Sequence, residues 1–178
     1  IHVAAISGAI VADGDTLRVT QLSGRAGNGT IAISGTIGVA APMPVALTIT
    51  ARDARPLSSD LLTATMDANL TVKGDIAGQL GIAGRVDVSR ANIQIPDKFP
   101  QSVAVLQVKR PGEKAPPPAP PSAPIALDLT VNAPEQVFVR GHGLDAEMGG
   151  ALRIAGTSAA PQIAGGFDLR HGTFSVAG

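Results

Sequence analysis

Residues 125–132 read IALDLTVN, and this stretch decides the fold class. Its odd-numbered positions are all aliphatic, and its even-numbered positions are small or polar. Successive side chains of a β-strand point to opposite faces of a sheet. The strict alternation therefore predicts a half-buried strand with one apolar face and one polar face.

The same two-residue period recurs along most of the chain. It is found in segments 31–34, 45–50, 70–73, 82–88, 93–95, 152–154, 167–169 and 174–176. Glycine or asparagine stands between many of these segments, as at Gly27-Asn28-Gly29, Gly149-Gly150 and His171-Gly172, which we interpret as turns. Strands of about five to eight residues at about ten-residue spacing predict an all-β, mostly antiparallel sheet of roughly a dozen strands.

Two segments interrupt this period. The run Pro56–Leu62 favours a short helix near residues 57–63, with three leucines on one side. Residues 109–124 read KRPGEKAPPPAPPSAP, and proline cannot donate to a strand ladder. We interpret them as a disordered, proline-rich loop insertion; a ligand for a proline-recognition domain is the weaker alternative. Residues 1–178 are otherwise expected to form one domain, as a fragment of a longer protein.

The chain contains an internal repeat. Leu70–Gly74 is followed by GIAG at 81–84, and Leu152–Gly156 is followed by QIAG at 162–165. Each copy continues with two more alternating segments. The pattern predicts hairpins stacked so that each covers the apolar face of its neighbour.

Composition excludes several classes of function. Lys and Arg number 14, as do Asp and Glu, so the formal net charge is zero and no nucleic-acid partner is expected. The absence of cysteine excludes a disulfide framework and thiolate chemistry. Hydrophobic residues make up 44% but aromatic residues only 2%, which disfavours stacking platforms for bases. No uninterrupted apolar run is long enough to span a membrane as a helix.

No residue cluster predicts catalysis or metal binding. His2, His142 and His171 lack a second ligand at metal spacing, and we interpret them as turn or surface residues. Gly141-His142-Gly143 lacks the strand–turn–helix setting of a phosphate-binding loop. No nucleophile–base pattern is present. We expect no enzyme activity, no metal and no cofactor.

Small residues suggest an open apolar face. Ala32, Ala83, Ala155, Gly165 and Gly166 are expected to point inward, where they would fill little volume. A sheet that curls around such a lining would accept acyl chains. The alternative, a closed sandwich with an ordinary packed core, stays open on these grounds.

The last third of the chain resembles a known family. Val137–Leu144 (VFVRGHGL), Gly150–Gly156 (GALRIAG), Pro161–Gly165 (PQIAG) and Leu169–Phe174 (LRHGTF) follow in the order found in the C-terminal domain of the TamB family, the translocation and assembly module subunit of the AsmA-like group. Residues 84–96 resemble the preceding repeat of that family. Met148, where an aromatic residue is frequent, and the long proline-rich insertion are departures.

The resemblance implies a curled β-sheet trough, called a β-taco, with an apolar interior. It also implies a periplasmic protein anchored to the inner membrane by an N-terminal helix. The implied partner is the Omp85-type outer-membrane barrel TamA. The implied roles are phospholipid transport between the membranes and the assembly of outer-membrane proteins, including autotransporters.

We therefore predict a non-enzymatic trough along which phospholipid acyl chains slide. One alternative is a chaperone-like receiver that binds unfolded strands of outer-membrane barrel or autotransporter clients by β-augmentation. A second alternative is a purely structural sandwich or solenoid. The residues predicted to line the trough are Ile31, Ile33, Leu47, Ile49, Leu70, Val72, Ile82, Val86, Ile93, Ile95, Leu127, Leu129, Val137, Val139, Leu152, Ile154, Ile163, Phe167, Leu169, Phe174 and Val176.

Overall fold

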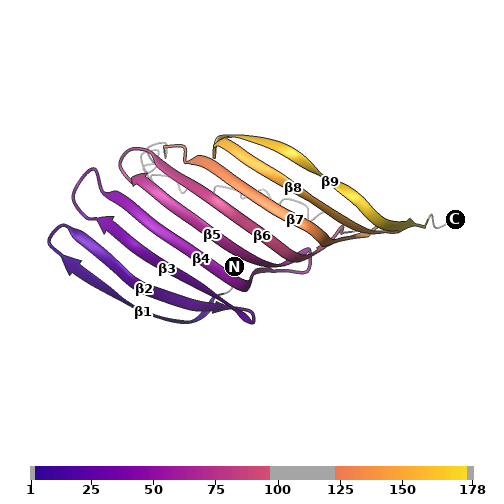
Figure 1. Ribbon diagram of the computed structural model, residues 1–178, viewed down its shortest axis with the longest axis horizontal. Coiled ribbons are helices and arrows are strands. Elements are labelled where there is room, and N and C mark those ends of the chain that lie inside the picture. Colours follow the sequence, from indigo (N-terminus) through magenta and orange to yellow (C-terminus); the bar gives the residue numbers. More distant parts are fainter. Residues whose placement is uncertain (1–2, 97–122, 176–178) are drawn as a thin grey trace, which may run out of the picture.

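The computed structural model describes residues 3–96 and 123–175, which form one nine-stranded sheet (Figure 1). The strands lie side by side in the order of the sequence, and all neighbours are antiparallel except β6 and β7. The prediction of an all-β, mostly antiparallel fold is confirmed. The strands are β1 (Ala4–Asp13), β2 (Thr16–Ala26), β3 (Gly29–Gly38), β4 (Pro44–Ser58), β5 (Leu62–Asp75), β6 (Leu80–Gln94), β7 (Ala126–Gly141), β8 (Leu144–Thr157) and β9 (Ala160–Phe174).

The strands are fewer and longer than predicted, with 10 to 16 residues each. The reason is that several glycines expected in turns lie inside strands. Gly149 and Gly150 lie within β8, and His171-Gly172 lies within β9. Glycine can bend a strand without ending it, because it accepts backbone angles that other residues avoid. The turn assigned to Gly27-Asn28-Gly29 is correct, since Gly27 and Asn28 connect β2 to β3.

The short helix predicted near residues 57–63 is wrong. β4 continues to Ser58, and β5 begins at Leu62. The backbone N–H of Ser59 donates to the Leu62 carbonyl at 2.9 Å, and the Leu62 N–H donates to the Ser59 hydroxyl at 3.1 Å. These bonds close a hairpin turn. The long antiparallel ladder on either side outweighs the weak local preference for helix.

β6 and β7 are parallel neighbours, which makes their connection different from all the others. For two successive strands to be parallel, the connection must lead from the end of the first strand back to the level of its start before the second strand begins. The proline-rich stretch 109–124 belongs to this connection, but only its last two residues are among those described. The predicted disorder of that stretch therefore remains a prediction.

The internal repeat of the sequence lies in β5–β6 and again in β8–β9, and the strands that precede them, β4 and β7, extend the likeness to two three-stranded units. β4, β5 and β6 have 15, 14 and 15 residues, and β7, β8 and β9 have 16, 14 and 15. The middle strands match position by position, so that Met66 corresponds to Met148 and Leu70 to Leu152. The chain thus builds a three-stranded unit twice, and the two units make up six of the nine strands.

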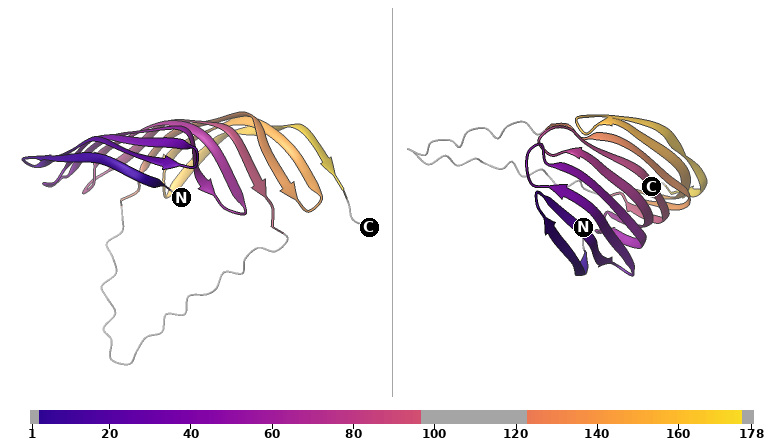
Figure 2. Two further views of the ribbon diagram at one scale, coloured as in Figure 1. Left: turned by 90° about the horizontal axis from the view of Figure 1, so that it is seen from below. Right: turned by 60° about the vertical axis from the view of Figure 1, so that its left-hand side comes forward.

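The sheet is strongly curved and remains open. Figure 2 shows an arch, with β1 and β9 at opposite ends of the ribbon. β1 and β9 are the two edge strands, so the sheet does not close into a barrel. Within the described parts of the chain, each strand packs essentially only against its neighbours in the sheet, and no second layer covers either face.

Candidate functional site: the concave face

The pairing register places aliphatic residues opposite one another across nearly the whole sheet. One row runs through Leu22, Ile33, Ile49, Leu70, Gly84, Leu129, Ile154 and Ile163, from β2 to β9. A parallel row runs through Val19, Gly35, Leu47, Val72, Ile82, Leu127 and Gly156. Residues directly opposite in a sheet share one face. These rows therefore form a continuous apolar surface.

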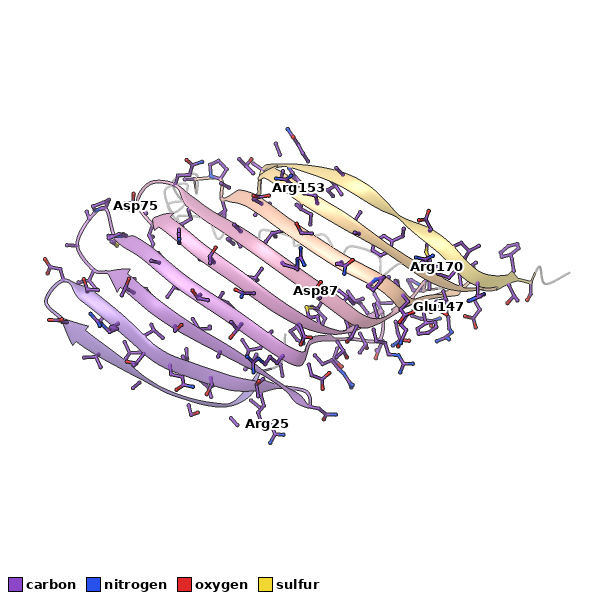
Figure 3. The ribbon with its side chains drawn as sticks, in the orientation of Figure 1. Arg25, Asp75, Asp87, Glu147, Arg153 and Arg170 are labelled. Atoms are coloured by element: carbon purple, nitrogen blue, oxygen red, sulfur yellow. The ribbon has the colours of Figure 1, made fainter. Side chains whose placement is uncertain are left out.

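The other face is polar and convex. β5 shows the separation most clearly: its even-numbered residues are apolar, whereas its odd-numbered residues are Thr, Asp, Asn and Lys. Figure 3 shows Asp87 and Arg153 on the viewer's side of the sheet, which is the outside of the arch in Figure 2. The aliphatic rows thus lie on the inside of the arch, which we call the concave face.

β-Bulges keep the aliphatic residues on the concave face where the sequence alternation changes phase. On β2 the register shifts between Val19 and Leu22, so one extra residue is absorbed. On β6 the shift falls between Val88 and Arg90, and on β9 it falls between Leu169 and His171. A bulge adds one residue and increases the local twist of a strand. The bulges therefore preserve the apolar face and contribute to its curvature.

Two further bulges, on β4 between Ala51 and Ala54 and on β7 between Ala133 and Val137, are held by carboxylates from the next strand. Asp53 on β4 has a φ of 46°, and its backbone N–H donates to Asp67 Oδ1 at 2.7 Å. Gln136 on β7 has a φ of 61°, and its N–H donates to Glu147 Oε1 at 3.1 Å. Each repeat unit thus uses an acidic side chain to bind the N–H that its bulge removes from the ladder.

The sheet brings the predicted lining residues together. All those that lie within described strands share the concave face. Ile95 follows directly after β6, and Val176 lies outside the described residues. Other aliphatic residues of this face were not among the predicted lining residues, although the same alternation marks them: Val19, Leu22, Ile37, Val45, Val88, Val131 and Met148. The assignment of this face to lipid remains a prediction.

The small residues of the concave face are not the ones that we predicted. Ala32, Ala83, Ala155 and Gly166 lie on the convex face, and of the five only Gly165 lies on the concave one. The buried small residues include instead Ala54, Ala64, Ala91 and Ala133, none of these four more than 7% exposed. Met66, Val88, Met148 and Phe167 pack against the last three of these. On this part of the concave face, buried alanines thus pack against larger, partly exposed apolar side chains.

Much of the apolar surface is open. Ile163 is 65% exposed, Leu169 63% and Phe174 68%. An apolar hollow of about 190 Å³ lies at the β2–β3 end, lined by Val3, Ile6, Leu22, Ser23, Gly24, Ile31 and Ile33. Large exposed apolar surfaces in proteins usually mark interaction sites.

The charged side chains of the sheet lie on the convex face and at the rims. Arg140 pairs with Asp145 at 3.1 Å, and Arg153 pairs with Asp128 at 3.1 Å. His142 lies in the β7–β8 turn, where its Nε2 is 3.0 Å from the Pro96 carbonyl oxygen, and His171 lies opposite Glu147. Among residues 3–96 and 123–175, no group of three or more metal-binding side chains comes together.

Comparison with known proteins decides the family. A family model described as the TamB C-terminal domain matches residues 20–178. The chain belongs to the TamB family. Searches of curated proteins and of solved structures give no match. The resemblance noted in the sequence is therefore confirmed, over nearly the whole chain.

Family membership carries several coarse properties. TamB proteins are periplasmic proteins of the cell envelope and work with an outer-membrane partner. The TamB family is not a known enzyme family. In the two described segments of this chain, no helix has the length and apolarity that crossing a bilayer requires.

Proposed function

We propose that this chain is a non-enzymatic part of the translocation and assembly module, and that its concave face guides phospholipid acyl chains across the periplasm. The observation that carries the proposal is the aliphatic row from Leu22 to Ile163, which crosses eight neighbouring strands. In this role the TamA barrel is the outer-membrane partner, and an N-terminal helix anchors the full protein in the inner membrane.

The physical basis is the cost of exposing acyl chains to water. Each CH₂ group transferred from water to an apolar surface gains about 0.8 kcal/mol. A continuous aliphatic lining keeps this gain nearly constant as a chain moves from strand to strand. The lining has no charged side chain along the row, so nothing there retains a headgroup, which stays in water at the open side of the arch.

The composition of the lining also suits a ligand that slides. Aromatic rings favour particular stacking geometries and hold partners in fixed positions. The row contains none: apart from Gly84, every member is a leucine or an isoleucine. A smooth lining of this kind has few points at which an acyl chain is trapped.

The test uses one charge placed on either face of the sheet. Leu129→Glu introduces a carboxylate in the centre of the row, and Thr130→Glu introduces the same carboxylate one residue away on the convex face. We expect phospholipid that co-purifies with the protein, quantified by mass spectrometry, to fall at least about tenfold for Leu129→Glu, because the loss of apolar contact exceeds about 1.4 kcal/mol. Thr130→Glu retains its lipid.

A third variant separates a blocked lining from an unfolded sheet. Ile163 belongs to the same row but is 65% exposed, so Ile163→Glu alters the lining at little cost to folding. Circular dichroism checks the fold of each variant. Undiminished lipid in folded Leu129→Glu and Ile163→Glu would refute the proposal, as would a parent protein that carries no phospholipid.

A further inference from the structure

Two arginines approach the β2–β3 turn, at the rim of the sheet where this hairpin closes. Arg25 is the last residue but one of β2, so its long side chain reaches the rim (Figure 3). Arg55 of β4 lies against the turn: a β-carbon added to Gly27 would be 2.9 Å from the Arg55 Cβ. A β-carbon on Gly29 would overlap the Asp53 carbonyl oxygen, so the hairpin packs directly on the bulge of β4. We call Arg25 and Arg55, together with this turn, the arginine corner.

The backbone of the arginine corner is held by a buried cluster. Each of the two arginines has a buried alanine next to it in the chain, Ala26 in β2 and Ala54 in β4. Both alanines are 0% exposed and belong to one apolar cluster, against which Ile31 packs. The arginines themselves are exposed. Binding at this corner therefore costs the ordering of two side chains but not of the backbone that carries them.

No carboxylate neutralises either arginine within the described parts of the chain. The ion pairs formed among residues 3–96 and 123–175 involve Arg140 and Arg153. Arg25 and Arg55 therefore keep their N–H donors, five on each guanidinium group, available to a ligand. Thr30, directly opposite Arg25, adds an exposed hydroxyl. Guanidinium groups bind the oxygens of phosphate and carboxylate groups in pairs, so the corner suits an anion of this kind.

The turns at the opposite rim carry negative charge. They join β1 to β2, β3 to β4, β5 to β6 and β8 to β9. In the part of the chain that the structure describes, the charged residues that lie in these turns or end the adjoining strands are Asp13, Asp15 and Asp75. An anion inside the arch is repelled by these carboxylates, which favours its position at the arginine corner.

The arginine corner borders an apolar hollow of the concave face. Gly24 and Ile31 lie opposite each other and line the hollow of about 190 Å³ at the β2–β3 end. Gly24 directly precedes Arg25 in β2, so the surface changes from apolar to cationic within one residue along the strand. A ligand that fills both places has an aliphatic tail joined to an anionic group.

We propose that the arginine corner binds the phosphate group of a phospholipid whose acyl chain lies in the adjoining hollow. The inference rests on the lipid function proposed above, and it adds the place where the headgroup is held. The guanidinium groups donate to the phosphate from the rim, and the phosphate stays in contact with water. The corner thus selects lipids that carry a phosphate over uncharged acylglycerols.

The test compares two lipids with the same acyl chains, dioleoylphosphatidylglycerol and dioleoylglycerol. The purified protein is incubated with equal amounts of both in micelles of an uncharged maltoside detergent, and the retained lipid is measured by mass spectrometry after gel filtration. The decisive variant is Arg25→Gln/Arg55→Gln. The matched control, Arg18→Gln/Arg85→Gln, removes the same two charges from other places on the convex face.

We expect the parent protein to retain more dioleoylphosphatidylglycerol than dioleoylglycerol. In Arg25→Gln/Arg55→Gln, retained phosphatidylglycerol should fall about fivefold, the effect of two exposed charge interactions, while retained dioleoylglycerol is unchanged. The control variant should keep the ratio of the parent protein. Circular dichroism verifies that both variants are folded.

Two outcomes would overturn the inference and leave the lipid proposal intact. One is equal retention of the two lipids by the parent protein, and the other is the same change of ratio, or none, in both double variants. Retention of neither lipid would refute the lipid proposal and the inference with it.

A last arm separates a lipid headgroup from a free anion. Inorganic phosphate is added to the parent protein without lipid, and its binding is followed by phosphorus NMR. We expect no binding, because the free ion lacks the acyl chain that the hollow holds. Binding that is lost in Arg25→Gln/Arg55→Gln would show a site for free phosphate and would overturn the assignment to a lipid headgroup.

Discussion

Gly84 offers the sharpest test of how the concave face is formed. It lies in the centre of the aliphatic row, between Leu70 on β5 and Leu129 on β7. Its φ is 144°, and a β-carbon added there would overlap the Asn69 carbonyl oxygen and approach the Leu70 Cα to 2.9 Å. The replacement Gly84→Ala therefore creates both backbone strain and a collision with the neighbouring strand.

The expected cost follows from these two effects. A non-glycine residue held in an unfavourable φ region costs about 1–3 kcal/mol, and forcing extra atoms into a packed site costs about 1–3 kcal/mol. We expect Gly84→Ala to lower the free energy of unfolding by about 4 kcal/mol. With a urea m-value of about 2 kcal/mol/M, the midpoint of unfolding falls by about 2 M.

Gly166 is the matched control. It also lies within a strand, but its φ is unexceptional and an added β-carbon there meets nothing within 4 Å. Gly166→Ala is expected to leave stability unchanged or to raise it by about 0.4–1 kcal/mol, because alanine restricts the unfolded chain more than glycine does. Urea titrations followed by circular dichroism measure both variants. Equal midpoints for the two would refute the backbone strain and the collision expected at Gly84.

Two other features of the sheet lead to predictions. The variants Asp67→Ala and Glu147→Ala each remove one of the carboxylates that bind a bulge. Each should lower the free energy of unfolding by about 1 kcal/mol, because the backbone N–H of Asp53 or Gln136 loses its partner but remains accessible to water. Urea midpoints equal to that of the parent protein would contradict this role. The 31 residues between Gln94 and Ala126 must return along β6, a distance of about 45 Å at 3.3 Å per residue. Deleting residues 109–121 leaves 18 connecting residues that reach about 60 Å, so the protein should still fold; deleting 99–121 leaves eight that reach about 27 Å, so the β6–β7 pairing should be lost. Hydrogen exchange at β6 and β7 measures both deletions, and equal protection in the two would contradict the expected span.

The separation of apolar and polar faces was readable from the sequence because it is a local property. Alternation fixes which side chains of one strand point the same way, whatever the strand pairs with. Leu127 and Leu129, or Leu70 and Val72, had to share a face once each segment was extended. The repeat was also readable, since the corresponding residues of β5 and β8 keep the same spacing.

The strand boundaries were less readable, because glycine has two opposite uses. Gly27 ends a strand, whereas Gly150 and Gly172 continue one, and nothing adjacent to them distinguishes the two cases. The difference lies in the neighbouring strand, which either pairs across the glycine or does not. The false helix at 57–63 has the same origin, since the turn is specified by the ladders of β4 and β5.

The sequence by itself determined that this protein is a β-sheet with one aliphatic face, built partly from a repeated unit, and it carried the signature of the TamB family. Only the tertiary structure decided that β6 and β7 are parallel, that the aliphatic rows join in register from β2 to β9, and that they line the inside of an arch. The physical reason is that alternation is set by bonds between successive residues. Pairing partners, bulges and curvature depend on residues far apart in the chain, which meet only when the sheet forms.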